Sequence, residues 1–384
     1  MDKRLLERIA EMSTPFYLYD GALLRHTLQS IAEAVSGHPI RIHYAVKANG
    51  NPGILSLIAA AGLGADCVSG GEIEASIKAG FAPASICYAC VGKTDREILQ
   101  ALKVGIGCFN VESIEELGII SHIAEAHGFQ ARVALRVNPD IDAHTHHYIT
   151  TGLEENKFGI DMRMLDKAVD LAMALPGIEL TGLHFHIGSQ VTVMAPFEIL
   201  CRRINDLLDR YQEKGVVFKT INVGGGLGID YDHPDFNPIP DFKAYFDTFI
   251  RGIRLSPGQE IHCELGRAVV AQCGSLISRV ILVKEGVERK FVVIDAGMND
   301  LIRPALYQAH HNIENLTAPQ GAPIETYDVV GPVCESSDTF AVGERLPHTQ
   351  RGDLIAIRSA GAYGESMAST YNMRPLVSSL ITDE

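Results

Sequence analysis

The chain has 384 residues, enough for one large domain or two smaller ones. Its composition is that of an ordinary globular protein, with 46% hydrophobic and 21% charged residues. The net charge of −14 argues against nucleic acid or an anionic membrane surface as a partner, because both attract clustered Lys and Arg. The sequence holds no apolar run of about 18 residues, the length that a membrane-spanning helix requires.

The N-terminal residues 1–8 (MDKRLLER) have the pattern of an amphipathic helix and lack the apolar core and cleavage site of a signal peptide. The eight cysteines do not follow the spacing of a disulfide framework. We therefore expect reduced thiols and a cytoplasmic protein. The cysteines are Cys67, Cys87, Cys90, Cys108, Cys201, Cys263, Cys273 and Cys334.

Eight short apolar runs alternate with amphipathic segments between residues 41 and 265. The runs are 42–46, 65–68, 86–90, 107–110, 133–137, 180–186, 220–223 and 261–264. They are rich in branched residues and do not alternate cleanly, as expected for strands buried on both faces. The helical segments between them are 52–61, 71–79, 95–103, 113–127, 162–173, 197–212 and 241–253. This pattern predicts an α/β fold, a TIM-type (β/α)₈ barrel. An open doubly wound sheet is the alternative, but no early strand is followed by a GxGxxG turn.

The pattern changes after about residue 268. Strand-like segments are 269–270, 275–283, 291–294, 326–330 and 354–357, and helical patterns are few. We expect a C-terminal all-β domain, a sandwich or barrel. The extended segment 16–19 precedes a first barrel helix at 21–35 and is able to pair into either domain. The expected boundaries are 26–268 for the barrel and 269–384, with residues 1–25, for the β domain.

Four features that bear functional groups follow predicted strands of the barrel. Lys47 ends the first strand, His186 the sixth and Glu264 the eighth, and three glycines at 224–226 follow the seventh. Functional groups of a TIM-type barrel gather at the carboxyl ends of its strands. We therefore expect these groups to meet on one rim.

Each feature also has a structural interpretation. In the structural interpretation, Lys47 is an ordinary solvent-exposed lysine and His186 is a core histidine beside His184. Glu264 is then an ion-pair partner of Arg267. The glycines are able to form a tight turn, although three in succession are costly in conformational entropy. A desolvated lysine amine is instead a nucleophile that forms Schiff bases, and consecutive backbone N–H groups form a phosphate nest. With a carboxylate for a pyridine nitrogen, these are the groups that pyridoxal phosphate requires.

The chain resembles the fold-type III pyridoxal-phosphate decarboxylases of the alanine racemase and ornithine decarboxylase group, and within it the diaminopimelate decarboxylase family. The resemblance runs from residue 14 to residue 376. The motifs that carry it are 43–49 (HYAVKAN), 184–189 (HFHIGS), 222–228 (NVGGGLG), 303–307 (RPALY) and 334–338 (CESSD). One departure is Leu265, where the family usually has proline.

The resemblance implies roles for individual residues. Lys47 would form a Schiff base with pyridoxal 5′-phosphate, and His186 would stack on its ring. Glu264 would pair with the pyridine nitrogen. Further cofactor contacts would come from Gly225, Gly226, Gly266, Arg267 and Tyr363.

The substrate implied is meso-diaminopimelate, which would lose one carboxylate to give L-lysine. Its distal carboxylate would bind Arg267, Arg303 and Tyr307, beside Tyr363. Cys334 would act as the proton donor, and Glu335 would bind the distal ammonium. In relatives the CESSD motif reaches the site of the partner subunit, so we expect a homodimer with shared sites. The alternatives are a carboxynorspermidine or other basic amino acid decarboxylase and a non-catalytic pyridoxal-phosphate carrier.

No metal site is expected from the sequence. Cys87 and Cys90 have CxxC spacing, but within a strand residues three apart face opposite sides. His144, His146 and His147 lie in a loop without further ligands and are expected to be solvated. A free cysteine such as Cys334 is often a small buried hydrophobe, so its assigned role depends on the resemblance alone.

Overall fold

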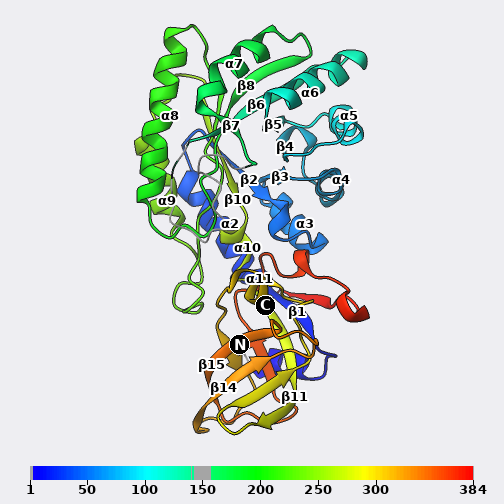
Figure 1. Cartoon of the computed structure of the whole chain (residues 1–384). Helices are drawn as coiled ribbons and strands as arrows, with labels where there is room; N and C mark the ends of the chain where they lie inside the picture. Colours follow the sequence, from blue (N-terminus) through cyan, green and yellow to red (C-terminus); the bar gives the residue numbers. More distant parts are fainter. Residues whose placement is uncertain (1–2, 140, 142–156, 384) are drawn as a thin grey trace. The chain divides into compact units, whose positions relative to one another are not determined.

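The computed structural model describes residues 3–139, 141 and 157–383. The described chain forms two compact units (Figure 1). The barrel unit comprises residues 27–228 and 241–266, and the β-rich unit comprises residues 1–26, 229–240 and 267–384. The boundaries expected from the sequence differ from these units, because they place residues 229–240 in the barrel. In the described residues, no helix combines the length and apolar character needed to cross a membrane.

The barrel unit contains a closed parallel barrel. Its strands run in the order β2 (Ile40–Ala45), β3 (Gly64–Cys67), β4 (Ile86–Ala89), β5 (Cys108–Val111), β6 (Ala131–Asn138), β8 (Ile178–His184), β9 (Thr220–Asn222) and β10 (Glu260–Leu265), and β10 pairs with β2. A two-residue strand, β7 (Ile160–Asp161), adds to β6. All eight predicted strands are confirmed, with ends shifted by up to two residues. The open doubly wound sheet is excluded because the sheet closes on itself.

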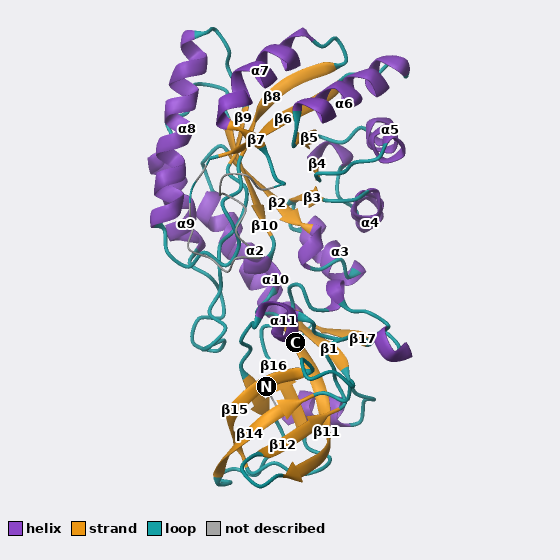
Figure 2. Ribbon diagram, viewed as in Figure 1, coloured by secondary structure: helices purple, strands orange, loops and turns teal. Residues whose placement is uncertain are grey.

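Helices lie on the outside of the barrel strands (Figure 2). They are α2 (Gly21–Val35), α3 (Pro52–Ala60), α4 (Gly70–Ala79), α5 (Asp95–Val104), α6 (Ile114–Ala126), α7 (Leu165–Ala174), α8 (Ala195–Glu213) and α9 (Phe242–Gly252). Local sequence determines their ends. Thr94 and Glu97 form a reciprocal capping box at the start of α5, and Gly105 ends this helix in the left-handed conformation.

The β-rich unit is built on one continuous sheet. Its strands are β1 (Phe16–Asp20), β11 (Gly274–Glu285), β12 (Lys290–Ile294), β13 (Ile313–Asn315), β14 (Ile324–Val330), β15 (Thr339–Pro347), β16 (Leu354–Ile357) and β17 (Ser378–Thr382). The order β13-β16-β11-β12-β14-β15 is mostly antiparallel, and β1 pairs with both β11 and β17. The extended segment 16–19 thus belongs to this sheet.

Short helices complete the β-rich unit: α1 (Lys3–Ala10), α10 (Arg267–Val270) and α11 (Arg303–Tyr307). The expected N-terminal helix is confirmed, and Ile9 of α1 is buried in an apolar core with Phe16 and Ile277. The prediction of a strand at 269–270 is wrong, because these two residues end α10. Two adjacent branched residues are too few to define a strand period.

Candidate active site

Lys47 lies in a single 3₁₀ turn, η1 (Val46–Ala48), directly after β2. Its Nζ is 3.9 Å from Asp66 Oδ2 on the neighbouring strand β3. Asp66 is buried, and burial together with the nearby Glu264 charge raises the pKa of its carboxyl although Lys47 opposes the shift. The Lys47 side chain is 43% exposed, so the protein alone does not desolvate its ammonium. Lys47 is therefore distinguished by its position at the carboxyl end of a barrel strand and not by burial.

Glu264 is a buried hydrogen-bond acceptor in the barrel core. Its Oε1 accepts from Asn110 Nδ2 at 2.9 Å and from Asn222 Nδ2 at 2.7 Å, and its Oε2 lies 3.0 Å from His184 Nε2. Burial alone would raise the pKa of Glu264, but His184, with support from Lys47, holds this pKa well below its usual value. The carboxylate is therefore ionised. Three donors use three of its roughly four acceptor positions, which leaves one for a further N–H.

His186 lies two residues beyond the end of β8. Its Nδ1 accepts the backbone N–H of Gly225 at 3.3 Å. Burial, followed by the charges of Arg136 and Lys47, lowers the pKa of His186 well below its usual value. The ring is therefore neutral, with the lone pair on Nδ1, and Gly225 fixes its orientation.

The glycine loop requires the absence of side chains. Gly224 and Gly226 have φ of 72° and 106°, in the region that favours glycine. A Cβ on Gly225 would overlap the carbonyl oxygen of Glu264, and one on Gly226 would come within 2.6 Å of the Gly188 carbonyl oxygen. The glycines thus let the loop pass directly against the ends of β8 and β10.

In the β-rich unit, Arg267 and Arg303 form a buried cationic cluster around Tyr231. Arg267 donates to Tyr231 Oη at 2.6 Å, and the Arg303 guanidinium lies 4.7 Å from the Tyr231 ring centre. Arg303 also donates from Nη1 to His311 Nε2 at 2.7 Å. Burial lowers the pKa of Arg303, and the adjacent Arg267 charge adds to this shift. Among the ion pairs of the described residues, none joins Arg303 to a carboxylate.

Tyr363 belongs to the same cluster. The Arg267 guanidinium lies 4.9 Å from the centre of its ring. Tyr363 has φ of 57°, an unusual conformation for a residue with a bulky side chain. The nearby glycines are closely packed, because a Cβ on Gly361 would overlap the Val270 carbonyl oxygen and one on Gly364 would lie 2.6 Å from Tyr17 Oη. Tyr307, the last residue of α11, is half-buried.

Cys334 and Glu335 are exposed on a tight turn. The buried carboxylate of Asp338 organises the turn, accepting from Val333 N–H at 2.6 Å and Met298 N–H at 2.7 Å. Glu335 accepts from Tyr371 Oη at 2.6 Å. The interpretation of Cys334 as a small buried hydrophobe is therefore wrong.

The structure places the sequence-predicted residues in two groups, one in each unit. The barrel unit holds Lys47, His186, Gly225, Gly226, Glu264 and Gly266, and the β-rich unit holds Arg267, Arg303, Tyr307, Cys334, Glu335 and Tyr363. Glu264 contacts His184 Nε2, which forms an ion pair with it when the imidazole is protonated. The interpretation of Glu264 as an ion-pair partner of Arg267 stays a prediction.

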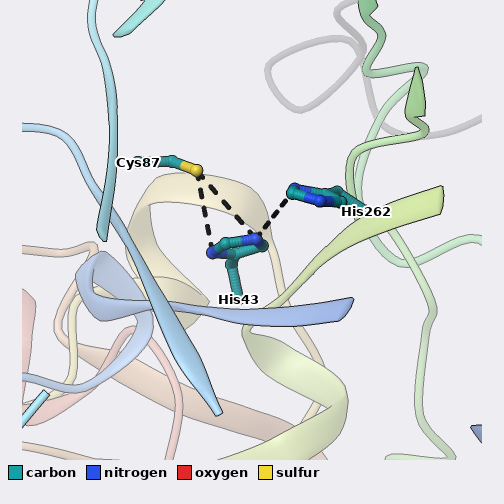
Figure 3. A group of neighbouring side chains, drawn as sticks. All are labelled: His43, Cys87 and His262. Atoms are coloured by element: carbon teal, nitrogen blue, oxygen red, sulfur yellow. Dashed lines mark hydrogen bonds between the residues drawn. The ribbon is translucent and has the colours of Figure 1, made fainter. Parts of the chain in front are cut away.

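Sequence reasoning gave no role to five polar residues that support these groups: Asn110, His184, Asn222, Tyr231 and His311. A signal existed for the asparagines, since each is a polar residue in an otherwise apolar strand. Tyr231 and His311 carried no such signal, because they lie in segments without a periodic pattern. His144, His146 and His147 lie outside the described residues. The buried thiol of Cys87 lies against His43 (Figure 3).

Comparisons with known proteins agree with this architecture. The family model described as "Pyridoxal-dependent decarboxylase, pyridoxal binding domain" matches residues 22–271. Diaminopimelate decarboxylase of Bacteroides thetaiotaomicron is 54% identical over 380 residues, which cover 99% of this chain and 98% of the relative. The Helicobacter pylori (J99) enzyme of the same name is 43% identical over 97% of this chain and 91% of its own.

A solved structure is similar over nearly the whole chain. Diaminopimelate decarboxylase from Helicobacter pylori complexed with L-lysine has a TM-score of 0.93 and 41% identity, covering 99% of this chain and 94% of its own. Fold and matches together define a pyridoxal-dependent decarboxylase built on a (β/α)₈ barrel and a separate, mostly sheet domain. Within this class, the chain belongs to the diaminopimelate decarboxylase family.

Proposed function

We propose that the protein removes the carboxylate from one end of meso-2,6-diaminopimelate, giving L-lysine and carbon dioxide as the last step of lysine biosynthesis, with pyridoxal 5′-phosphate as its cofactor. The 54% identity to a diaminopimelate decarboxylase over nearly the full length of both chains supports this activity. The proposal rests on particular residues in each unit.

Three observations support the binding of pyridoxal phosphate by the barrel residues. Glu264 is ionised, buried and retains an acceptor position, as a protonated pyridine nitrogen requires. The backbone at Gly225 and Gly226 has no room for side chains. Lys47 places an amine at the carboxyl end of β2, next in the closed barrel to the strand that carries Glu264. When bound, the cofactor supplies an electron sink for the pair of electrons left behind by carbon dioxide.

The barrel side chains would hold and orient this cofactor. Lys47 Nζ would bond to its aldehyde carbon and exchange with the substrate amine. Glu264 would keep the ring nitrogen protonated, and the neutral imidazole of His186 would stack on the ring. Because Gly225 N–H already donates to His186, Gly226 is the stronger candidate for the phosphate contact.

The observation that carries the choice of substrate is the burial of Arg303 beside Arg267. Arg303 is 5% exposed and has no carboxylate partner among the ion pairs of the described residues. A buried charge without a counter-ion is costly, so this arrangement suits a protein whose ligand brings the carboxylate. Planar guanidinium groups bind carboxylates in bidentate geometry. Diaminopimelate retains a carboxylate at its non-reacting end, whereas lysine and ornithine do not.

We further propose that the protein is a homodimer in which Cys334 and Glu335 serve the partner's site. Both side chains face outward, as a residue that serves another subunit must. Exposed apolar residues accompany them, because Tyr371, whose hydroxyl bonds to Glu335, is followed by Met373 and Leu376, 96% and 60% exposed. We take these exposed apolar residues, close together in sequence, as the candidate dimer contact. There Cys334 Sγ would deliver a proton to the substrate α-carbon, and Glu335 would bind the distal ammonium.

A cytoplasmic location is part of the same proposal. All eight cysteines are free thiols, and Cys334 is exposed. Its assigned role requires the thiol to stay reduced, which a reducing compartment provides.

The test is a product assay with competing substrates. Purified protein with pyridoxal phosphate is incubated separately with meso-diaminopimelate, L-lysine, L-ornithine and carboxynorspermidine, and carbon dioxide and amine products are measured. We expect L-lysine from diaminopimelate in equimolar amount with carbon dioxide, and little turnover of the other three. Faster turnover of lysine, ornithine or carboxynorspermidine than of diaminopimelate would show that the protein is a decarboxylase of that other substrate. Bound cofactor without turnover of any substrate would indicate a carrier.

A further inference from the structure

A second cluster of metal-ligating side chains lies in the barrel, outside the proposed active site. His43 of β2, Cys87 of β4 and His262 of β10 each offer one ligand atom, and these atoms all lie within 4.8 Å of one another (Figure 3). His43 and Cys87 are buried, and His262 is partly buried. The proposed chemistry does not use any of the three.

The cluster borders a cavity of about 600 Å³ at the amino-terminal end of the barrel. All eight barrel strands contribute to its lining, through residues near their starts such as Arg41, Cys108 and Glu260. Lys47 and His186 instead follow the carboxyl ends of their strands. The cavity therefore gives a small ion or water a path to the cluster from the amino-terminal end of the barrel, and Asn110 and Asn222, which hydrogen-bond to Glu264, form part of its wall.

The two imidazoles contact each other through ring nitrogens. His43 Nδ1 lies 3.1 Å from the Ser85 carbonyl oxygen, and His43 Nε2 lies 3.0 Å from His262 Nδ1. A neutral His43 ring carries its hydrogen on Nδ1, facing Ser85, so its Nε2 lone pair faces His262. His262 Nε2 lies 3.6 Å from Glu260 Oε2, which is too far for a hydrogen bond.

A metal ion bound by His43 Nε2 and His262 Nδ1 would leave the ring hydrogens on the outer nitrogens, His43 Nδ1 and His262 Nε2. Neutral imidazoles are the state that ligates metals. Their outer nitrogens already face a carbonyl and a carboxylate, the partners that orient metal-bound histidines in proteins. Of the buried side-chain polar atoms, His262 Nε2 is one without a hydrogen bond among the described residues, so the Glu260 contact has room to tighten.

Cys87 adds a third ligand at the same place. Its Sγ lies 4.0 Å from His43 Nε2. From typical Zn–N and Zn–S bond lengths, a tetrahedral zinc ion needs about 3.3 Å between two nitrogens and about 3.5 Å between nitrogen and sulfur. The observed 3.0 Å and 4.0 Å differ from these by half an ångström or less, and all three ligand atoms lie within 4.8 Å of one another. Cys87 Sγ lies closer to His43 Nδ1, at 3.7 Å, so binding at Nε2 requires the thiol to move toward His262.

We propose that His43, Cys87 and His262 bind a zinc ion whose fourth ligand is a water molecule from the cavity. Two imidazoles and a thiolate suit a borderline-soft divalent ion. The ion joins β2, β4 and β10 at the amino-terminal end of the barrel, so its binding stabilises the folded chain. The proposal does not depend on the decarboxylase activity.

Cobalt(II) substitution tests the site directly. The chelator-treated holoenzyme is titrated with Co²⁺, and the absorbance bands of tetrahedral cobalt and of thiolate-to-cobalt charge transfer are recorded against the cofactor-only spectrum. We expect one equivalent of Co²⁺ to produce both bands and one equivalent of Zn²⁺ to displace it. Thermal unfolding should shift upward on addition of Zn²⁺.

Ligand variants and matched controls identify the site. Cys87→Ser should abolish the charge-transfer band, and His262→Asn should weaken Co²⁺ binding by about 100-fold or more. Cys108→Ser, which alters a thiol in the wall of the same cavity, and Cys334→Ser, which alters the exposed thiol, should retain the band. The histidines of residues 144–147 have no neighbouring cysteine in the sequence to supply a thiolate. Equal cobalt affinity in wild type, Cys87→Ser and His262→Asn, or no charge-transfer band in the wild type, would overturn the proposal.

Discussion

His184 Nε2 lies 3.0 Å from Glu264 Oε2 in the buried core of the barrel. Because Glu264 is ionised and only accepts, His184 donates. The same carboxylate accepts from Asn110 and Asn222, so side chains of β5, β8 and β9 hold one acid of β10 in place. In the proposed function, this arrangement would prepare Glu264 to keep a pyridine nitrogen protonated.

Replacing His184 with phenylalanine should destabilise the protein by about 1–3 kcal/mol at pH 7, since a buried charged acceptor loses a donor. The folded-state pKa of Glu264 lies below its unfolded value. This stabilisation is therefore present above about pH 4.3 and is lost as the pH falls toward the folded pKa. Urea unfolding from pH 7 to pH 3 measures both effects.

The difference between wild type and His184→Phe should shrink below pH 4.3. His122→Phe, at an exposed histidine of α6, is the matched control and should change stability by less than about 0.5 kcal/mol. A His184→Phe protein as stable as wild type at pH 7 would show that the hydrogen bond contributes nothing.

Arg303→Lys should lower kcat/KM for diaminopimelate by on the order of 10- to 100-fold, mainly through KM, because lysine cannot form the bidentate contact. Cofactor binding should be unchanged. Arg289→Lys is the control, since Arg289 is 62% exposed and pairs with Asp328. If steady-state kinetics show an unaltered KM in Arg303→Lys, Arg303 does not bind the substrate.

Met373→Asp combined with Leu376→Asp should convert the proposed dimer to monomers, because both side chains are exposed and apolar and follow Tyr371, which hydrogen-bonds to Glu335. Activity should fall with the dimer. Val287→Asp tests an equally exposed apolar residue between β11 and β12, and it should leave the dimer intact. Analytical ultracentrifugation and activity are measured on the same samples. A fully active monomer would contradict the shared site.

Mixing Lys47→Ala subunits with Cys334→Ala subunits should restore activity that neither variant has alone. Random reassociation makes half of the dimers mixed, and each mixed dimer has one complete site, so about a quarter of wild-type activity is expected. The mixture is assayed for lysine release after unfolding and refolding together. If the mixture recovers no activity, Lys47 and Cys334 act within one subunit.

Much of the fold was predictable because its signals are local. The eight barrel strands are short apolar runs between amphipathic helices, and even the capping box at Thr94 is visible in the sequence. The three-residue strand β13 lacks a detectable period, and the strand-like pair Val269 and Val270 proved helical. Runs of two or three residues carry too little information to separate strand from helix.

Candidate site residues were predictable where their residue type is rarely found at such a position for structural reasons alone. Lys47 at a strand end and three consecutive glycines are such cases. The sequence left open whether Lys47 is exposed or desolvated, because accessibility depends on segments distant in sequence; the structure shows its side chain 43% exposed. Tyr231 between the two arginines was missed for the same reason, since its contact with Arg303 spans parts of the chain that share no sequence pattern.

The central claim is that Lys47 bonds to pyridoxal phosphate. Borohydride treatment of the holoenzyme, followed by peptide mass mapping, tests it most directly, with Lys219→Ala, at an exposed lysine paired with Glu179, as the control. We expect a pyridoxyl group on Lys47 in wild type and in Lys219→Ala, whereas Lys47→Ala should lose the visible absorbance and kcat should fall by about 10³-fold or more. A pyridoxyl group on another lysine, or an unchanged visible spectrum in Lys47→Ala, would contradict the claim.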